Sequence, residues 1–223
     1  MALSQEQNRL LEKHLELVLE ANESTNLTRI DDWEAGKVLH IEDSLEAVKD
    51  ISSKDNIKNI VDLGSGSGFP GIPLSIATGI TTTLVETVRK KADWLKYFVF
   101  ELNLENQIFV SNKRIEEHSK EKCNFYDIAT ARALSSLSSL LELASPLLKI
   151  NGFFIAYKGK DVVEEINCAT NIQEKFGFKL IVNRSYTLSN NTEHRIIVFQ
   201  KYKNSSINLP RKYGFAQKKP FQS

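Results

Sequence analysis

Glycines at alternate positions follow a short apolar run in the first third of the chain. The run Ile57–Leu63 predicts a buried strand, and the loop Gly64–Gly68 (Gly-Ser-Gly-Ser-Gly) comes directly after it. Glycine permits positive φ and lets a ligand approach the backbone without a Cβ in the way. Pro70 and Pro73 suit the first turn of a helix, where a missing amide hydrogen costs nothing. A strand, a glycine-rich turn and a helix start together predict a nucleotide-binding loop.

The loop by itself fits two classes of cofactor-binding enzyme. The segment Gly66–Gly71 matches Gly-x-Gly-x-x-Gly, so an NAD(P)-dependent oxidoreductase is one hypothesis. Asp62 extends the pattern to Asp-x-Gly-x-Gly-x-Gly, which resembles motif I of S-adenosylmethionine-dependent methyltransferases. The two prolines also interrupt the segment in which a dinucleotide-binding helix would run unbroken. No Gly-x-x-x-x-Gly-Lys-Ser/Thr sequence is present, so a P-loop phosphoryl-transfer enzyme is not indicated.

Residues with useful chemistry follow the other predicted strands. Glu86 lies about twenty residues after the loop, as expected for a carboxylate that binds ribose hydroxyls. The alternative is a helix-start glutamate stabilised by the helix dipole. Ile115 and Glu116, after the third strand, are candidates for contacts to an adenine ring. Arg132 follows the fourth strand, where a guanidinium can pair with a ligand carboxylate or a substrate phosphate.

The composition is that of an ordinary globular chain. Its 223 residues are 41% hydrophobic and 26% charged, enough for one α/β domain with an accessory segment. No apolar run is long enough to span a bilayer and no secretory signal is visible, so we expect a cytoplasmic protein. Cys123 and Cys168 are too few and too far apart for a disulfide framework or a zinc site. We therefore expect no metal and two buried thiols.

The C-terminal region is basic although the net charge is only +1. After Glu193 there is no acidic residue, and lysines and arginines continue to Lys219 with tyrosines and phenylalanines between them. Such a segment can neutralise phosphates and stack on bases. A solvated terminus without a partner is the equal alternative.

Periodicity places these residues on alternating strands and helices. Residues 1–55 read as an N-terminal helical extension, with a capping box at Ser4–Gln7 and a second helix between Asp32 and Val48. Residues 56–203 read as a mostly parallel, seven-stranded α/β domain with helices on both faces and an antiparallel C-terminal hairpin. Residues 204–223 form the basic tail. The predicted strands are Ile57–Leu63, Thr82–Glu86, Gln107–Val110, Tyr126–Ala131, Phe153–Tyr157, Lys179–Tyr186 and Arg195–Tyr202; the later predicted helices are Pro73–Thr78, Arg89–Leu102, Leu134–Leu148 and Val162–Phe176.

Short motifs distributed over nearly the whole chain point to one family. They are Asn26-Leu27-Thr28, His40-Ile41-Glu42-Asp43-Ser44, the loop Asp62–Pro73, Ser111–Glu116, Thr130–Ala133, Ala156–Gly159 and Leu209–Lys212. With these motifs the chain resembles the glucose-inhibited division protein B family, bacterial methyltransferases that act on guanine N7 in the 16S ribosomal RNA of the small subunit. The resemblance implies a Rossmann-like class I methyltransferase fold, S-adenosyl-L-methionine as cofactor, and 16S ribosomal RNA or the small ribosomal subunit as partner. We expect a monomer that does not bind membranes.

The resemblance also implies roles for individual residues. Gly64, Phe69, Ile115, Glu116 and Arg132 would contact the cofactor, and the loop pattern adds Gly66, Gly68 and Glu86. We predict Arg132, His40 and Asp43 as catalytic residues, with Ser44 nearby, and Lys158, Arg195, Arg211 and Lys212 as RNA contacts. The family commonly has Glu-Arg-His or Arg-Asn before the last strand, whereas this chain has Glu193-His194-Arg195. Whether His194 or Arg195 fills the usual arginine position stays open.

The implied reaction requires little of the protein. Guanine N7 carries a free lone pair, so the enzyme has to align the nitrogen with the methyl group and exclude water, and no general base is needed. His40 reads equally well as a hydrogen-bonded structural histidine. A further alternative is a non-catalytic RNA-binding factor for ribosome assembly that retains a vestigial pocket. The intact loop, Glu86 and Arg132 argue against that alternative.

Overall fold

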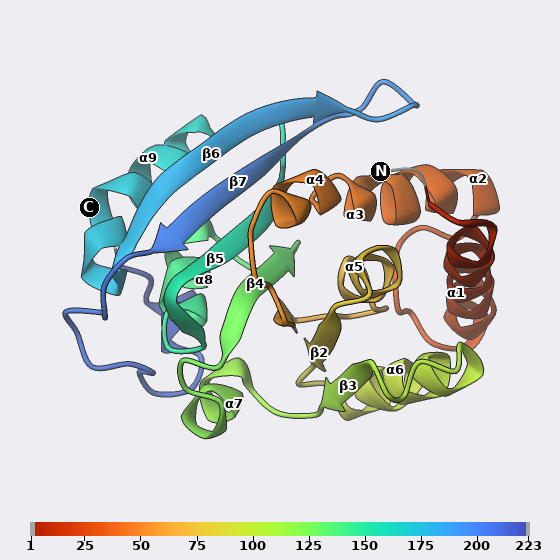
Figure 1. The fold of residues 1–223 in the computed structure, drawn as a ribbon, viewed down its shortest axis with the longest axis horizontal. Helices are drawn as coiled ribbons and strands as arrows, with labels where there is room; N and C mark the ends of the chain where they lie inside the picture. The colour runs from red at the N-terminus through yellow and green to blue at the C-terminus, as the bar shows by residue number, and fades with distance from the viewer. Residues whose placement is uncertain (1–2, 222–223) are drawn as a thin grey trace.

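The computed structural model, which describes residues 3–221, contains one seven-stranded sheet in the order β3-β2-β1-β4-β5-β7-β6 (Figure 1). Strand β7 runs antiparallel to both of its neighbours, and the other neighbouring pairs are parallel. The strand order reverses at β1, whose neighbours are β2 and β4, and ligands bind outside the carboxyl ends of strands at such a point. The strands are β1 (Asn59–Leu63), β2 (Thr81–Val85), β3 (Ile108–Ser111), β4 (Tyr126–Arg132), β5 (Leu148–Gly159), β6 (Phe178–Thr187) and β7 (Glu193–Lys201).

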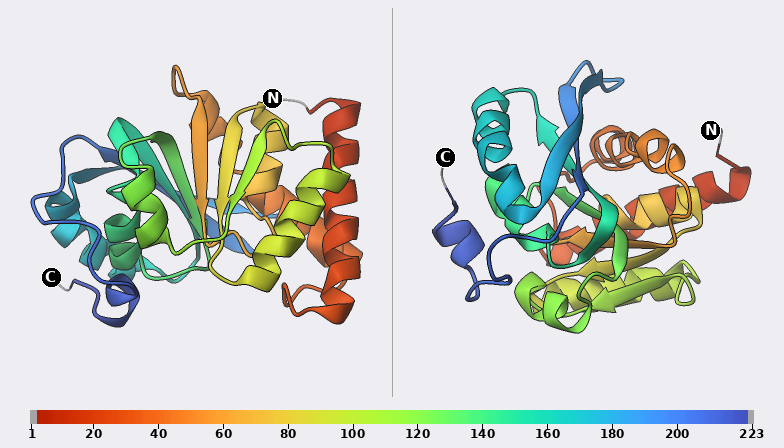
Figure 2. Two further views of the ribbon diagram at one scale, coloured as in Figure 1. Left: turned by 90° about the horizontal axis from the view of Figure 1, so that it is seen from below. Right: turned by 60° about the vertical axis from the view of Figure 1, so that its left-hand side comes forward.

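Helices cover both faces of this sheet (Figure 2). Successive side chains of a strand point to opposite faces. Val61 shares a hydrophobic cluster with residues of α8 (Leu137–Ala144) and α9 (Val163–Ile172), while Ile60 shares one with residues of α4 (Val48–Ser52) and α5 (Gly71–Thr78). The two faces therefore bury different hydrophobic clusters. The helices of the α/β region are α5 (Gly71–Thr78), α6 (Arg89–Glu101), α7 (Ile115–Glu121), α8 (Leu137–Ala144), α9 (Val163–Ile172), the 3-10 turn η2 (Gln173–Phe176) and α10 (Phe215–Lys218).

The N-terminal helices pack directly on this α/β framework. Helix α1 (Gln5–Ser24) begins with the predicted capping box, and its Leu11 and Leu15 share a cluster with Phe69 and residues of α5 and α6. The second predicted helix begins at its Asp32 cap but contains a π-helical segment in its middle. Its parts are α2 (Trp33–Gly36), the π-helix η1 (Lys37–Glu42), α3 (Asp43–Leu45) and, after a turn, α4 (Val48–Ser52).

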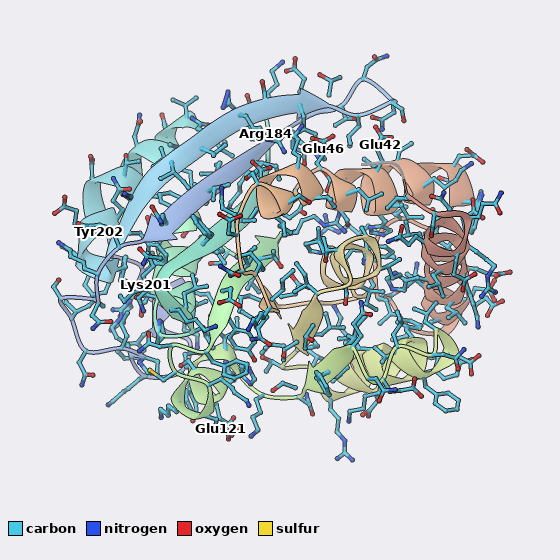
Figure 3. All side chains as sticks on the ribbon, viewed as in Figure 1. Glu42, Glu46, Glu121, Arg184, Lys201 and Tyr202 are labelled. Carbon is cyan, nitrogen blue, oxygen red and sulfur yellow. The ribbon has the colours of Figure 1, made fainter. Side chains whose placement is uncertain are left out.

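The hairpin of β6 and β7 reaches over the second helical region. Figure 3 shows Arg184 of β6 beside Glu46. The Arg184 guanidinium pairs with Glu46 at 3.1 Å and with Asp50 at 2.7 Å. These ion pairs join the antiparallel edge of the sheet to the N-terminal helices.

Several local predictions were wrong. The predicted helix Leu134–Leu148 is limited to α8, because Pro146 has no amide hydrogen with which to continue the helix and Leu148 already begins β5. Helices α7 and α10 were not predicted. Both cysteines are exposed: Cys123 lies in the turn after α7, and Cys168 lies on the outer side of α9.

Neither a membrane-spanning helix nor a metal-binding cluster occurs among the residues that the structure describes. Within 3–221 no helix is both long and apolar enough to cross a bilayer. The same residues include no cluster of histidine, cysteine or carboxylate side chains suited to a metal ion.

Candidate active site

A cavity of about 300 Å³ lies beyond the carboxyl ends of β1 and β2, and we call it the loop pocket. This volume is at the lower end of the range for small-molecule sites. The pocket is bordered by three of the predicted strand ends, by the backbone after β4, and by the C-terminal segment. Its lining residues are Gly64, Gly66, Val85, Glu86, Thr87, Lys91, Arg114, Ile115, Glu116, Ala133, Leu134 and Gln217.

The glycine loop has the left-handed conformation that its sequence predicts. Gly64 has φ +69° and Gly66 has φ +57°. A Cβ on Gly64 would lie 2.6 Å from a Leu134 methyl carbon, whereas a Cβ on Gly66 would have no neighbour closer than 3.9 Å among residues 3–221. Gly64 is therefore required by packing, and Gly66 leaves open space next to its backbone. This open backbone fits a nucleoside cofactor at the loop.

Glu86 ties the glycine loop to the start of α6. Its Oε2 accepts a hydrogen bond from the Gly66 amide at 3.0 Å, and its Oε1 accepts one from the Val88 amide at 2.7 Å. The carboxylate also borders the loop pocket. Glu86 therefore supports the helix start and also borders the cavity, while its contact with a ribose stays a prediction.

The third wall of the loop pocket comes from α7 and the tail. Ile115 and Glu116, the residues predicted to contact an adenine, form the first turn of α7, and both border the cavity. Glu116 Oε1 accepts a hydrogen bond from the Gly214 amide at 2.6 Å. Gln217 also lines the cavity, and no sequence motif indicated it.

A second cavity of about 360 Å³ lies beside Arg132, and we call it the arginine pocket. It is formed where β4, β5 and β7 meet the N-terminal helices. Ala133 borders both pockets and has φ +54°, which is rare for a residue with a side chain and is found disproportionately at functional sites. The lining residues are Ile30, Leu39, Asp43, Arg132, Ala133, Tyr157, Lys158, Gly159 and His194.

Asp43 is the centre of the polar network in the arginine pocket. Arg132 donates to its Oδ2 at 2.7 Å, and Tyr186 and His194 donate to its Oδ1 at 2.6 and 2.7 Å. Burial opposes ionisation of Asp43, but the Arg132 charge and these hydrogen bonds outweigh it and lower the pKa of the carboxyl. Asp43 is therefore an ionised group that orients three side chains of the sheet.

His40 holds Arg132 from behind and does not border either pocket. Its Nδ1 lies 3.1 Å from an Arg132 nitrogen, and its Nε2 lies 3.0 Å from the Thr28 hydroxyl. Burial, and then the nearby Arg132 charge, lower the pKa of His40 to about 3. Its ring stacks on Phe69 at 4.3 Å with an interplanar angle of 3°. A neutral ring with both nitrogens engaged is suited to positioning Arg132.

Phe69 and Gly68 also lie behind the loop pocket. Phe69 is 5% exposed and packs between His40 and His14, whose ring centroids are each 4.3 Å from its own. A Cβ on Gly68 would lie 2.6 Å from Ile72 and 3.0 Å from His14 Nε2. The structure therefore places these two predicted cofactor residues in the support of the loop, while the other predicted cofactor residues border a cavity.

The four predicted RNA contacts have different surroundings. Lys158 borders the arginine pocket and pairs with Glu165 at 2.6 Å. Arg195 donates to Asn183 on the neighbouring strand, outside both pockets. Arg211 forms two hydrogen bonds with the buried carboxylate of Glu142, at 2.5 and 2.7 Å. Lys212 is exposed, and it is the one most accessible to a phosphate.

The structure decides which of two residues at the start of β7 faces the arginine pocket. His194 pairs with Gly159 across β5 and β7, borders the arginine pocket and binds Asp43. Arg195 is the next residue of the strand, so its side chain points to the opposite face. Of these two residues, His194 is the one that faces the arginine pocket.

Comparisons with known proteins agree with this geometry. Residues 7–196 match the model of a family described as rRNA small subunit methyltransferase G. The chain belongs to this family. The ribosomal RNA small subunit methyltransferase G of Alkaliphilus metalliredigens is 36% identical over 93% of this chain and 87% of its own length. That of Mycoplasma capricolum is 39% identical over 95% of this chain and 90% of its own.

Solved structures show the same fold at much lower identity. An O-methyltransferase from Bacillus cereus, solved in complex with SAH, is 17% identical and has a TM-score of 0.57. The similarity covers 84% of this chain and 90% of that one. The predicted class I methyltransferase fold is confirmed, and the oxidoreductase hypothesis is not supported.

Proposed function

We propose that this enzyme transfers a methyl group from S-adenosylmethionine to N7 of a guanine in 16S ribosomal RNA. The observation that carries the proposal is the pair of pockets that meet at Ala133, one on the glycine loop and one beside Arg132. A methyl transfer needs its donor and its acceptor in adjacent sites that exclude water. Family membership supports ribosomal RNA as the substrate class.

The loop pocket fits the nucleoside part of the cofactor. Gly66 offers open backbone, Glu86 offers a carboxylate for ribose hydroxyls, and Ile115 and Glu116 lie where an adenine would be held. When bound, the cofactor supplies an electrophilic methyl group on a positively charged sulfur. The residues of the pocket have to hold that group toward Ala133 and the arginine pocket.

The arginine pocket fits a flipped guanine. Leu39, Ala133 and Tyr157 supply apolar surface for the ring, while Arg132 and His194 supply polar atoms at its edge. We propose that Arg132 donates to O6, the acceptor beside N7, and leaves the N7 lone pair free. Asp43 keeps both polar side chains in place.

His40 and Asp43 act in this proposal by positioning Arg132. A general base is unnecessary because N7 has no proton to lose, and the lowered pKa of His40 keeps its ring neutral. A substrate of ribosomal RNA would also place the enzyme in the cytoplasm, and we propose that it acts there as a monomer.

Site-specific chemistry on methylated RNA tests the proposal. The protein is incubated with S-adenosylmethionine and 16S ribosomal RNA, either free or in the small subunit. Borohydride reduction followed by aniline then cleaves the chain at 7-methylguanosine, and primer extension locates the break. A single new stop at a guanine is expected. Methylation without cleavage would place the methyl group on another atom, and no methylation of either substrate would favour the assembly-factor alternative.

Arg132 can be tested against a matched arginine. Arg132→Ala removes a partner of buried Asp43, and Arg184→Ala removes a partner of the mostly buried Asp50. Neither Arg184 nor Asp50 lines either pocket. Both variants are expected to lose thermal stability, because each leaves a carboxylate without its cation. Only Arg132→Ala should lose methyl transfer per folded molecule, by at least about a hundredfold. Equal activity of the two folded variants would make Arg132 a structural anchor.

A further inference from the structure

The C-terminal segment returns to the methyltransferase domain after the last strand. Figure 2 shows its helix α10 on the side of the molecule away from α1. Ala216 of α10 is 1% exposed and belongs to the hydrophobic cluster that contains Val61 and residues of α8 and α9. Its carbonyl accepts a hydrogen bond from the Ser139 hydroxyl at 2.6 Å. Arg211 forms its ion pair with Glu142, which is 3% exposed, and its guanidinium lies 4.2 Å from the Phe221 ring centroid. The segment is therefore anchored on α8 at several points.

This anchoring carries the segment to the rim of the loop pocket. Gly214 has φ +74°, and its amide donates to Glu116 Oε1 at 2.6 Å. Glu116 is 6% exposed and borders the cavity, so a single carboxylate contacts both the tail and the pocket. Three residues after Gly214, the exposed side chain of Gln217 also borders the cavity.

We propose that Gln217 binds the nucleoside part of the cofactor and that cofactor binding is coupled to the seating of residues 211–221 through Glu116. This inference rests on the proposed function. A carboxamide both donates and accepts, which suits the paired donor and acceptor at the edge of adenine. The cofactor and Gly214 use the same carboxylate, so occupation of the pocket and order in the tail stabilise each other. Such coupling is reciprocal.

Calorimetric titration with S-adenosylhomocysteine tests the contact. Gln217→Ala is compared with wild type and with Gln5→Ala, the same substitution at an exposed site on α1. Because Gln217 is exposed, the melting temperature should not change. Loss of one or two net hydrogen bonds should weaken binding about five- to tenfold. An affinity within twofold of wild type would overturn the assignment of Gln217.

Hydrogen exchange tests the coupling in the unaltered protein. Addition of S-adenosylhomocysteine should slow exchange of the backbone amides in 211–221, with the Gly214 amide most affected. Exchange that is the same with and without the ligand would overturn the coupling. Wild-type protein that does not bind S-adenosylhomocysteine would overturn the cofactor assignment itself, which separates that failure from a failure of the tail proposal.

Discussion

At the scale of single residues, the site depends on buried carboxylates whose hydrogen-bond partners are few and specific. Asp43 is 2% exposed and accepts from three side chains, and Asp62 is 1% exposed. Asp62 Oδ1 accepts from Thr130 at 2.9 Å, while its Oδ2 has no partner among the described residues. The pKa shifts of the two aspartates therefore have opposite directions: the Arg132 charge and the hydrogen bonds lower the pKa of Asp43, and burial raises that of Asp62 to about 6.

Two glycines allow the effect of a substitution on cofactor binding to be distinguished from its effect on backbone strain. Gly66 and Gly79 both have positive φ and open space at the Cβ position, but only Gly66 borders the loop pocket. Alanine at either position should cost about 1–2 kcal/mol of stability, because left-handed φ strains a residue with a Cβ. Gly66→Ala should also weaken S-adenosylhomocysteine binding more than tenfold by calorimetry, while Gly79→Ala should bind normally. Equal affinities would move the cofactor away from the loop.

Asp62 predicts an unusual pH dependence of stability. Its pKa rises from the ordinary 3.8 to about 6 in the folded state, so the native protein keeps a proton that the unfolded chain has lost. The contribution of Asp62 to stability is therefore greatest below pH 4 and falls between pH 4 and 6, by about 3 kcal/mol. Urea unfolding of Asp62→Asn should show the variant gaining that amount relative to wild type between pH 4 and 7. Parallel curves would contradict this account.

At the scale of secondary structure elements, the π-helix η1 and helix α1 support the site from outside the sheet. π-Helical turns are rare and frequently occur at functional sites. The η1 segment and the residue after it bring the Leu39 carbonyl, His40 and Asp43 to the Arg132 guanidinium. Helix α1 contributes His14, which is fully buried and donates from Nε2 to the Ser67 carbonyl at 3.1 Å. The N-terminal helices thus hold both the arginine and the loop.

Helix α1 can be tested by two substitutions one residue apart. His14→Ala removes the hydrogen bond to Ser67 and the contact with Phe69, whereas Leu15→Ala removes a side chain that packs toward Gly36. Both residues are fully buried, so each variant should lose about 2–5 kcal/mol of stability. Binding of S-adenosylhomocysteine to the folded protein should weaken at least fivefold only in His14→Ala. An equal effect of both would indicate that α1 supports the fold without specific action on the loop.

At the scale of the whole molecule, three distant parts of the chain meet around the two pockets. Asp43 comes from the N-terminal helices, the glycine loop and Arg132 come from the sheet, and Gln217 comes from the tail. The basic tail is therefore part of the folded structure. The alternative of a solvated terminus does not describe it. Its truncation would remove a wall of the loop pocket together with any RNA contacts.

The RNA contacts of the tail are better tested by removing charge than by truncation. Lys212 and Lys218 are exposed, and we expect them to contact phosphates. The double variant Lys212→Ala/Lys218→Ala should bind 16S ribosomal RNA with a shallower salt dependence, by roughly 0.7–0.9 of a log–log unit per lost contact. Lys58→Ala/Lys96→Ala, with both lysines also exposed, is the matched control for net charge. Identical slopes in filter binding would show that the tail lysines do not contact RNA.

The sequence by itself determined the features that depend on neighbouring residues. The glycine loop, the capping box at Ser4 and the alternation of strands and helices are local patterns, and each is present in the structure. Glu86 and Glu116 border one cavity because parallel strands place their carboxyl ends on one edge, and their contact with the cofactor stays a prediction. The family resemblance also rests on short local motifs, and the family match confirms it.

Only the tertiary structure decided the contacts between residues far apart in the chain. Side chains alternate between the faces of a strand, so a shift of one residue in the pairing of β5 with β7 would have exchanged His194 and Arg195. Two hydrogen bonds, from His194 to Asp43 and from the Gly214 amide to Glu116, join segments that are about 100 or more residues apart in the chain. No local pattern encodes such pairs, because they follow from how the tail and the N-terminal helices pack on the sheet.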